Sequence, residues 1–397
     1  MPEAKREAWI TGVGIVSTLG EGVDAHWQRL SAGQPSADVT TFAPFVVHPL
    51  APVNFDAQIP KKGDQRQMEN WQRIGTYAAG LALDSAGVKG NTEILSQMDM
   101  IVAAGGGERD LKVDATILDG YTKTANPAAF LNERLMGDLR PTLFLAQLSN
   151  LLAGNISIVH GVTGSSRTFM GEEAAGVDAV RIALSRIAAG QSDIALVGGA
   201  HNGERPEMLL LYEFAGECLK DKFVPVWERG DKGGFALGSL GAFLVIESRE
   251  HAEKRGAKPL ARLSAVVADR ASRQPGTITQ TLGKLWDKIK DKVKGGHAAI
   301  LSGATGAAQA TAEERAFLEQ HGELAVRATA TYLGHGMEPQ FAMNVALATV
   351  ALAHGSLYPP SDPTGLEKPM NGPLDQVVVT GVGHWRGEGI ALVERVG

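Results

Sequence analysis

The sequence predicts an α/β protein, and two observations carry that prediction. From Ala174 to Ala189, apolar residues recur at the spacing of one helix face, while charged residues occupy the opposite face. The helix is expected to end at Gly190, and the apolar run Ile194–Val197 then indicates a short buried strand. The composition agrees, because 48 glycines and 44% hydrophobic residues in a chain of 397 suit closely packed α/β layers rather than disorder.

A short internal sequence repeat indicates that the chain has two halves. The segment Ile10–Gly14 (ITGVG) is nearly repeated by Val379–Gly383 (VTGVG), and both segments favour buried strands. Four identical residues in a run of five arise either by duplication or by chance, and this pattern alone leaves both explanations open. The charged segment Glu247–Lys258 predicts a helical connection, so we place the two halves at residues 1–258 and 259–397.

Composition also excludes several classes of protein. The net charge of −6 provides no overall footprint for nucleic acid. The single cysteine, Cys218, excludes an internal disulfide and a multi-cysteine metal site, which is consistent with a reducing compartment. The first residues lack the apolar core of a signal peptide, and the apolar stretch Phe341–Ala353 is too short to span a bilayer. We therefore expect a cytoplasmic protein without a membrane span.

Common ligand-binding motifs fail in their context. The pattern Gly12-x-Gly14-x-x-Ser17 resembles a degraded dinucleotide fingerprint, but a turn at residues 33–37 replaces the strand that should end in an acidic residue. The glycines at 105–107 lack the Gly-Lys-Ser/Thr ending of a phosphate loop. The sequence shows neither a cluster with metal-ligand spacing nor a Gly-x-Ser-x-Gly nucleophile elbow. No metal is therefore predicted.

Several motifs together resemble the β-ketoacyl-acyl carrier protein synthases, most closely the elongating type II synthases of the thiolase-like superfamily. The resemblance covers nearly the whole chain, and implies a thiolase-like fold with duplicated α-β-α-β-α layered halves. It makes duplication the better explanation of the short repeat, and it implies a dimer. The segments that carry it are Trp9–Gly20, Lys62–Met68, Ile74–Val88, Met98–Gly107, Ser165–Gly176 (SSRTFMGEEAAG), Gly234–Glu247 and Tyr332–His335 (YLGH).

The resemblance also implies a catalytic set, most of which is replaced in this chain. The family uses a cysteine at the start of a helix, two histidines and a lysine. Glu173 stands at the cysteine position, Gly303 at the first histidine and Ala330 at the lysine, whereas His335 matches the second histidine. A carboxylate is a poor substitute for the thiolate, because an acyl anhydride would hydrolyse. Glu173 and its neighbour Glu172 are also explained simply by favourable interaction with the helix dipole, and a lone histidine is often structural.

Three further residues could contribute to the site that the resemblance implies. Trp385 falls at the position of the family's gating phenylalanine, within the segment Gly383–Gly389. His384 could place an imidazole near the site, but packing or solvent exposure is the favoured interpretation. Cys218 is interpreted as a buried apolar thiol rather than a displaced nucleophile.

Carrier-protein docking is predicted from basic residues. Lys61, Lys62 and Arg66 match a family helix whose basic side chains meet the acidic acyl carrier protein, and Arg73 follows two turns later. The alternative is an ordinary solvated face. The 4′-phosphopantetheine group arrives on the carrier protein, so no cofactor of the chain's own is expected.

Three hypotheses for function follow. The first is a non-condensing partner subunit, like the chain-length factors that pair with an active synthase. The second is an enzyme with altered residues, either a 3-oxoacyl-carrier-protein synthase or a malonyl decarboxylase. The third is a free-standing acyl or carrier-protein binder. Arg167 lies in the strand expected at the dimer interface. If its charge is buried there, two copies would bring like charges together, which favours a heterodimer with a cysteine-bearing synthase over a homodimer. The alternative is that Arg167 lies at the solvent-exposed end of the strand.

Overall fold

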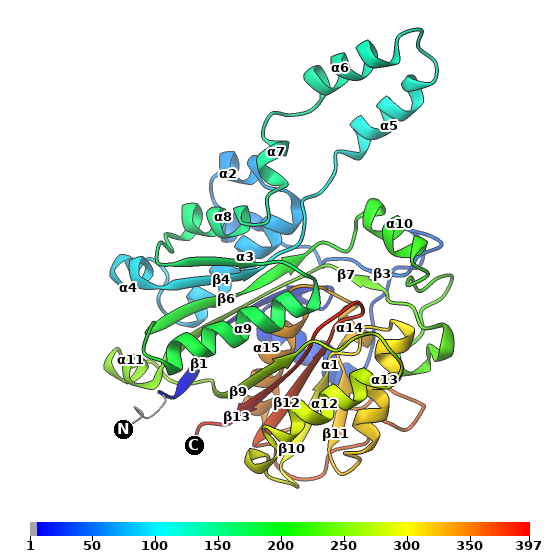
Figure 1. Cartoon of the computed structure of the whole chain (residues 1–397). Coiled ribbons are helices and arrows are strands. Elements are labelled where there is room, and N and C mark those ends of the chain that lie inside the picture. Colours follow the sequence, from blue (N-terminus) through cyan, green and yellow to red (C-terminus); the bar gives the residue numbers. More distant parts are fainter. Residues whose placement is uncertain (1–5) are drawn as a thin grey trace.

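The structure is a computed structural model that describes residues 6–397, and an 11-stranded mixed sheet forms its framework (Figure 1). In order across the sheet, its strands are β11 (Ala325–Ala328), β10 (Ala298–Ser302), β12 (Gln376–Val382), β13 (Glu388–Glu394), β9 (Ala261–Asp269), β1 (Ala8–Ser17), β8 (Leu240–Ser248), β6 (Ile194–His201), β4 (Asp99–Ala103) and β5 (Ser166–Phe169), with β2 (Gly20–Glu21) paired to β1.

These strands form two sets of five with the same topology. The first set is β1, β4, β5, β6 and β8 in chain order, and the second is β9 to β13. In each set the third strand lies at the outer edge, followed inward by the second, fourth, fifth and first. Pairing is parallel among the second, third and fourth strands and antiparallel for the fourth with the fifth and the fifth with the first. The two sets meet where β1 pairs with β9. The fold is duplicated, as predicted.

The short sequence repeat has a different origin from the duplication of the fold. Ile10–Gly14 belongs to β1, the first strand of its set, whereas Val379–Gly383 begins in β12, the fourth strand of the other set. The equivalent glycines Gly12 and Gly381 make different close approaches: a Cβ at Gly12 would lie 2.5 Å from the Ala82 carbonyl oxygen in a covering helix, whereas a Cβ at Gly381 would lie 2.8 Å from the Phe341 ring. Separate close contacts therefore produced similar short sequences on non-equivalent strands.

Helices form three layers around the two sets of strands. The middle layer is α9 (Glu173–Ala188) and α15 (Gln340–His354), which contact each other and strands of both sets. The first set is covered on its outer side by α3 (Asn70–Ser85) and α8 (Leu151–His160). The second set is covered by α12 (Thr277–Asp287) and α13 (Ala308–Glu319) (Figure 1). This is the predicted α-β-α-β-α layering.

The middle layer confirms the helix and strand predicted first from sequence. Helix α9 covers the expected residues, and Gly190 adopts φ 67°, a left-handed conformation that glycine reaches without steric cost. Strand β6 begins at Ile194 as predicted and extends further. Helix α15 is buried from Gln340 to Leu352, as expected for a helix that is apolar on all sides. Together these helices place the core between the two sets of strands.

The junction between the two sets lies in the segment predicted to connect the halves. Helix α11 (Arg249–Lys254) occupies it, while residues 247 and 248 still belong to β8. The other elements are α1 (Gly22–Ala32), α2 (Lys62–Gln67), α4 (Thr92–Gln97), α10 (Pro206–Phe214), α14 (Ala330–Leu333), the pair β3 (Val47–His48) and β7 (Leu237–Gly238), and the 3-10 helices Phe55–Ala57, Val226–Glu228, Gly230–Lys232 and Lys290–Lys292.

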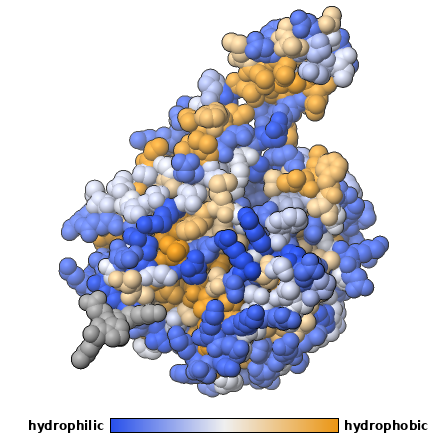
Figure 2. Space-filling model, in the orientation of Figure 1, coloured by the Kyte–Doolittle hydropathy of each residue, from blue (hydrophilic) through white to orange (hydrophobic). Residues whose placement is uncertain are grey.

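One arm projects from this layered body. It is formed by α5 (Leu111–Tyr121) and α6 (Pro127–Asp138), with α7 (Leu143–Ala146) at its base (Figure 1). Figure 2 shows apolar surface along the arm, to which Leu118 and Met136 contribute with 74% and 79% exposure. Within residues 6–397, no helix combines the length and apolar character needed to cross a membrane.

Candidate functional site

The site is built around Glu173, the first residue of α9. The chain enters this helix from β5 through a tight turn in which Glu172 adopts φ 57° and ψ −135°. A non-glycine residue in this region is strained, so the surrounding structure imposes the turn. The turn directs residue 173 into the protein, where Glu173 is only 4% exposed. The turn and the start of α9 thus fix the side chain of Glu173, the residue predicted at the nucleophile position, in the protein interior.

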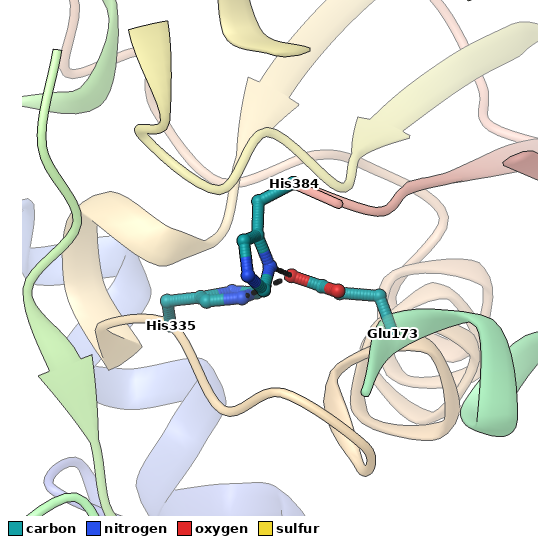
Figure 3. A group of neighbouring side chains, drawn as sticks. All are labelled: Glu173, His335 and His384. Carbon is teal, nitrogen blue, oxygen red and sulfur yellow. Dashed lines mark hydrogen bonds and ion pairs between the residues drawn. The ribbon is translucent and has the colours of Figure 1, made fainter. Parts of the chain in front are cut away.

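Two histidines reach Glu173 from the second half of the chain. His335 follows α14, and its backbone is held by hydrogen bonds from its N–H to the Ala236 carbonyl and to its carbonyl from the Gly238 N–H. His384 follows β12 in a turn closed by a hydrogen bond from the Gly383 N–H to the Gly387 carbonyl. Figure 3 shows both imidazoles pointing at the same carboxylate.

Both histidines bond to one oxygen of Glu173. His335 Nε2 lies 2.6 Å from Glu173 Oε1, and His384 Nδ1 lies 2.8 Å from the same atom. An ionised carboxylate only accepts hydrogen bonds, so both imidazole nitrogens donate. Within residues 6–397, the second oxygen, Glu173 Oε2, is buried without a hydrogen-bond partner, as is His335 Nδ1. The three side chains are at most 7% exposed.

The electrostatics make this group an ion pair. Burial would raise the pKa of Glu173, but the charge of His384 and the hydrogen bonds from both histidines hold it well below its usual range. Burial likewise disfavours the charged form of His384, yet the Glu173 carboxylate raises the pKa of His384 to about 9. Glu173 is therefore ionised and neutralised by an imidazolium, which leaves it neither a free base nor a nucleophile.

Further polar groups surround this cluster. Tyr212 Oη lies 3.5 Å from Glu172 Oε1, and His201 Nδ1 lies 3.9 Å from Glu338 Oε2. Burial raises the pKa of Glu338 to about 7, with added repulsion from Glu172 and Glu173, and burial also raises the pKa of Glu172. None of the recognised sequence motifs contains Tyr212, His201 or Glu338, so these residues were not predicted.

The two other replaced positions lie within the second half of the chain. Gly303 follows β10, and a Cβ built there would lie 2.5 Å from the Thr380 carbonyl oxygen and 2.9 Å from the Gly381 Cα. Both neighbours are backbone atoms, so no side chain fits at Gly303 without movement of the adjacent strand. Ala330, the predicted lysine position, is buried at the start of α14.

The loop after β12 differs from its sequence-based interpretation. His384 was expected to be explained by packing or solvent exposure, and this was wrong, because it is buried and bonded to Glu173. Trp385, the predicted gate, is instead 69% exposed. Gly383, where a Cβ would clash with the Arg386 carbonyl oxygen, allows the turn that brings His384 inward. The sequence does not show which of the neighbours His384 and Trp385 points into the protein. Cys218 is buried, and burial raises the pKa of its thiol to about 12.

The predicted docking residues lie on α2, at one side of an arginine-rich pocket. Lys61 precedes α2, Lys62 pairs with Asp56, and Arg66 contributes to the pocket. Arg73 does not continue the same helix as expected, because Met68 and Glu69 interrupt it and Arg73 belongs to α3. It nevertheless lines the same pocket of about 500 Å³, together with Arg109 and Arg140, which the sequence did not single out.

Comparison with known proteins assigns the family. Residues 5–252 match the model of the β-ketoacyl synthase N-terminal domain. The chain belongs to the β-ketoacyl synthase family. It is 27% identical over 266 residues to 3-oxoacyl-[acyl-carrier-protein] synthase 2 of Vibrio cholerae, an alignment that covers 64% of this chain and 61% of that protein. The matched region thus spans about three fifths of the length of this curated relative.

Two solved structures have the same fold over almost the whole chain. The ishigamide ketosynthase/chain length factor gives a TM-score of 0.79 at 20% identity, with 99% of this chain and 100% of that chain covered. A type II polyketide acyl carrier protein in complex with its ketosynthase, AntDE:AntF, gives a TM-score of 0.76 at 17% identity, with the same coverage. The thiolase-like architecture is therefore shared from end to end of the described structure.

Proposed function

We propose that this chain is a non-condensing partner subunit of a cysteine-bearing β-ketoacyl synthase, in fatty-acid or related acyl-chain biosynthesis. The observation that carries the proposal is the ion pair of Glu173 with His335 and His384. It fills the position of the family's nucleophile with a neutralised carboxylate, and it engages the one family histidine that remains. Such a subunit would resemble the chain-length factor named in the ishigamide structure.

The remaining positions support the same proposal. Condensation needs a donor for the developing enolate oxygen, and loss of such a donor costs about 10²- to 10³-fold in rate. Gly303 provides no imidazole and has no room for one, and Ala330 provides no ammonium group. An altered synthase or a malonyl decarboxylase would need these groups to be supplied from elsewhere, so both remain the less supported alternatives.

The surface supports a partner subunit. Strand β5 lies at one end of the sheet, and the backbone groups on its outer side are available to a strand from a second chain. Arg167 on β5 would face its own copy across a two-fold axis, whereas a partner with a carboxylate would pair with it. The arm adds exposed apolar residues, including Leu118, Met136 and Phe144, of the kind that interfaces cover.

An acyl carrier protein is the second proposed partner. The arginines of the pocket beside α2 would attract its acidic surface and the phosphate of its 4′-phosphopantetheine arm. The carrier protein bound to the ketosynthase in the AntDE:AntF structure is consistent with this assignment. We propose that the chain needs no cofactor of its own for this role.

The test is co-expression with each cysteine-bearing synthase of the native host, followed by native mass spectrometry. We expect a one-to-one heterodimer with one of them, and we expect Arg167→Glu to weaken it. Arg270→Glu, which alters an exposed arginine away from β5, is the matched control. A homodimer in the presence of every such synthase would overturn the partner proposal in favour of an altered enzyme, and a monomer would favour a free-standing binder.

A further inference from the structure

The cluster of Glu173, His335 and His384 has the composition of a metal site. One carboxylate and two imidazoles come from three separate elements, and one ligand atom from each lies within 4.8 Å of the others. Figure 3 shows the two rings and the carboxylate directed at a common region. Two histidines and one glutamate form a known catalytic zinc set, and two histidines with a carboxylate also hold non-haem iron.

An unpartnered atom inside the cluster provides a second observation. Glu173 is 4% exposed, and its Oε2 has no hydrogen-bond partner within the described structure, although Oε1 accepts two hydrogen bonds. A buried carboxylate oxygen without a partner is costly. A cation bound between the carboxylate and the imidazoles would use this oxygen or its neighbour as a ligand.

The local charge also favours a cation. Glu172 and Glu338 add two carboxylates around Glu173, and the electrostatic interaction among the three is repulsive. His384 Nε2 lies 3.8 Å from Glu172 Oε2. A carboxylate near the second nitrogen of a coordinating histidine is the usual arrangement around metal-bound imidazole, because it orients the ring and strengthens it as a ligand.

We propose that Glu173, His335 and His384 bind a divalent first-row transition cation of the Zn²⁺ class. Ligand bonds of about 2.0–2.2 Å place tetrahedral ligand atoms about 3.3–3.6 Å apart. The present distances of 2.6 and 2.8 Å must therefore open by about 0.5–1.0 Å, which rotation of the side chains can supply. The ion pair is then the metal-free form of the site. On cation binding, His384 Nδ1 releases its proton to solvent, and the proton on His335 Nε2 moves to Nδ1 of the same ring.

This inference goes beyond the proposed function and does not depend on it. A cation at this position would join the start of α9, the loop before α15 and the turn after β12, which come from both halves of the chain. It can be tested on the purified chain without a synthase or a carrier protein, so its failure and the failure of the partner proposal are separate results.

The experiment is Zn²⁺ binding to the full-length chain after treatment with EDTA. We expect one Zn²⁺ per chain by calorimetry and elemental analysis, and d–d absorption bands for Co²⁺ in the same site. Glu173→Gln and His384→Ala should each weaken Zn²⁺ binding by more than about 100-fold. His297→Ala is the matched control, because His297 also bonds a carboxylate, that of Asp375 at 2.7 Å, but at the surface and without a second histidine.

Circular dichroism establishes whether each variant is folded. If Glu173→Gln does not fold, His384→Ala provides the test. Equal Zn²⁺ binding by the wild-type chain and a folded site variant would overturn the proposal, as would absence of stoichiometric binding by the wild-type chain. Loss of binding in His297→Ala, with retention in His384→Ala, would place the metal at the surface and overturn it as well.

Discussion

Replacing Glu173 by cysteine would place a thiol at the position predicted for the family's nucleophile and test whether the rest of the site can act. The thiol would lie at the start of α9, beside His335 and His384, where the helix dipole and imidazoles favour a thiolate. We expect Glu173→Cys to accept an acyl group from an acyl carrier protein at most. Glu172→Cys places a thiol one residue earlier in the strained turn and serves as the matched control.

Condensation should still fail, and the structure indicates by how much. Gly303 stands at the position predicted for the family's first histidine, and an imidazole donor there would be worth about 2.7–4 kcal/mol, or about 10²- to 10³-fold in rate. The neighbouring backbone, 2.5 Å from a Cβ at this position, leaves no room to recruit a replacement from residue 303 itself. The product should therefore stay below about 1% of that from a cysteine-bearing synthase under the same conditions.

The assay combines intact-protein mass spectrometry for acylation with detection of 3-oxoacyl product from acyl and malonyl carrier proteins. Acylation without product is the expected result. Abundant 3-oxoacyl product from Glu173→Cys alone would refute the reasoning, since it would mean that His335 or another group supports the malonyl half-reaction without Gly303 or Ala330 being changed.

Three further predictions concern buried groups outside the ion pair. Burial raises the pKa of Glu314 from 4.5 to about 7, so the folded state holds this proton more tightly than the unfolded state. The free energy of unfolding should therefore fall by up to about 3 kcal/mol between pH 4.5 and 7. Urea denaturation should show a smaller fall for Glu314→Gln, and the same pH dependence in this variant as in the wild-type chain would contradict the prediction. Gly303→Ala should destabilise the chain by about 1–3 kcal/mol, whereas Gly283→Ala, with open space around its Cβ, should not; equal effects would show that the strand adjusts. Cys218, 8% exposed and with a pKa raised to about 12, should react with a thiol reagent only after unfolding and carry no acyl group after incubation with acyl carrier protein; an adduct on the folded chain would identify a displaced nucleophile.

Local sequence patterns predicted individual elements of the fold well, whereas its layers were predicted from the family resemblance. The periodicity of α9, the glycine that follows it and the start of β6 are properties of neighbouring residues, so they were visible without a structure. The duplication was predicted from the family resemblance, whereas the short repeat considered beside it lies on non-equivalent strands. The true repeat is one of strand order, which sequence does not display when the side chains of the two halves have diverged.

The candidate site was predicted only in part, because its contacts are distant in sequence. Glu173 and His335 were found through their motifs, yet their hydrogen bond spans 162 residues and that of His384 spans 211. A sequence reveals metal ligands only where they recur at short spacing along the chain. Three proposed ligands from separate elements were therefore not recognised as a site. The direction of the turn after β12, which brings His384 inward and leaves Trp385 exposed, depends on tertiary contacts.

The division of the site between the two halves has a consequence for folding. Glu173 belongs to the first set of strands and helices, whereas both histidines belong to the second, so neither half can complete the ion pair alone. During folding, Glu173 would remain hydrated until the second half docks, since contacts of such long range form after local structure. The ion pair would then form only after the two halves have packed together. Hydrogen exchange at the start of α9 would report when this happens.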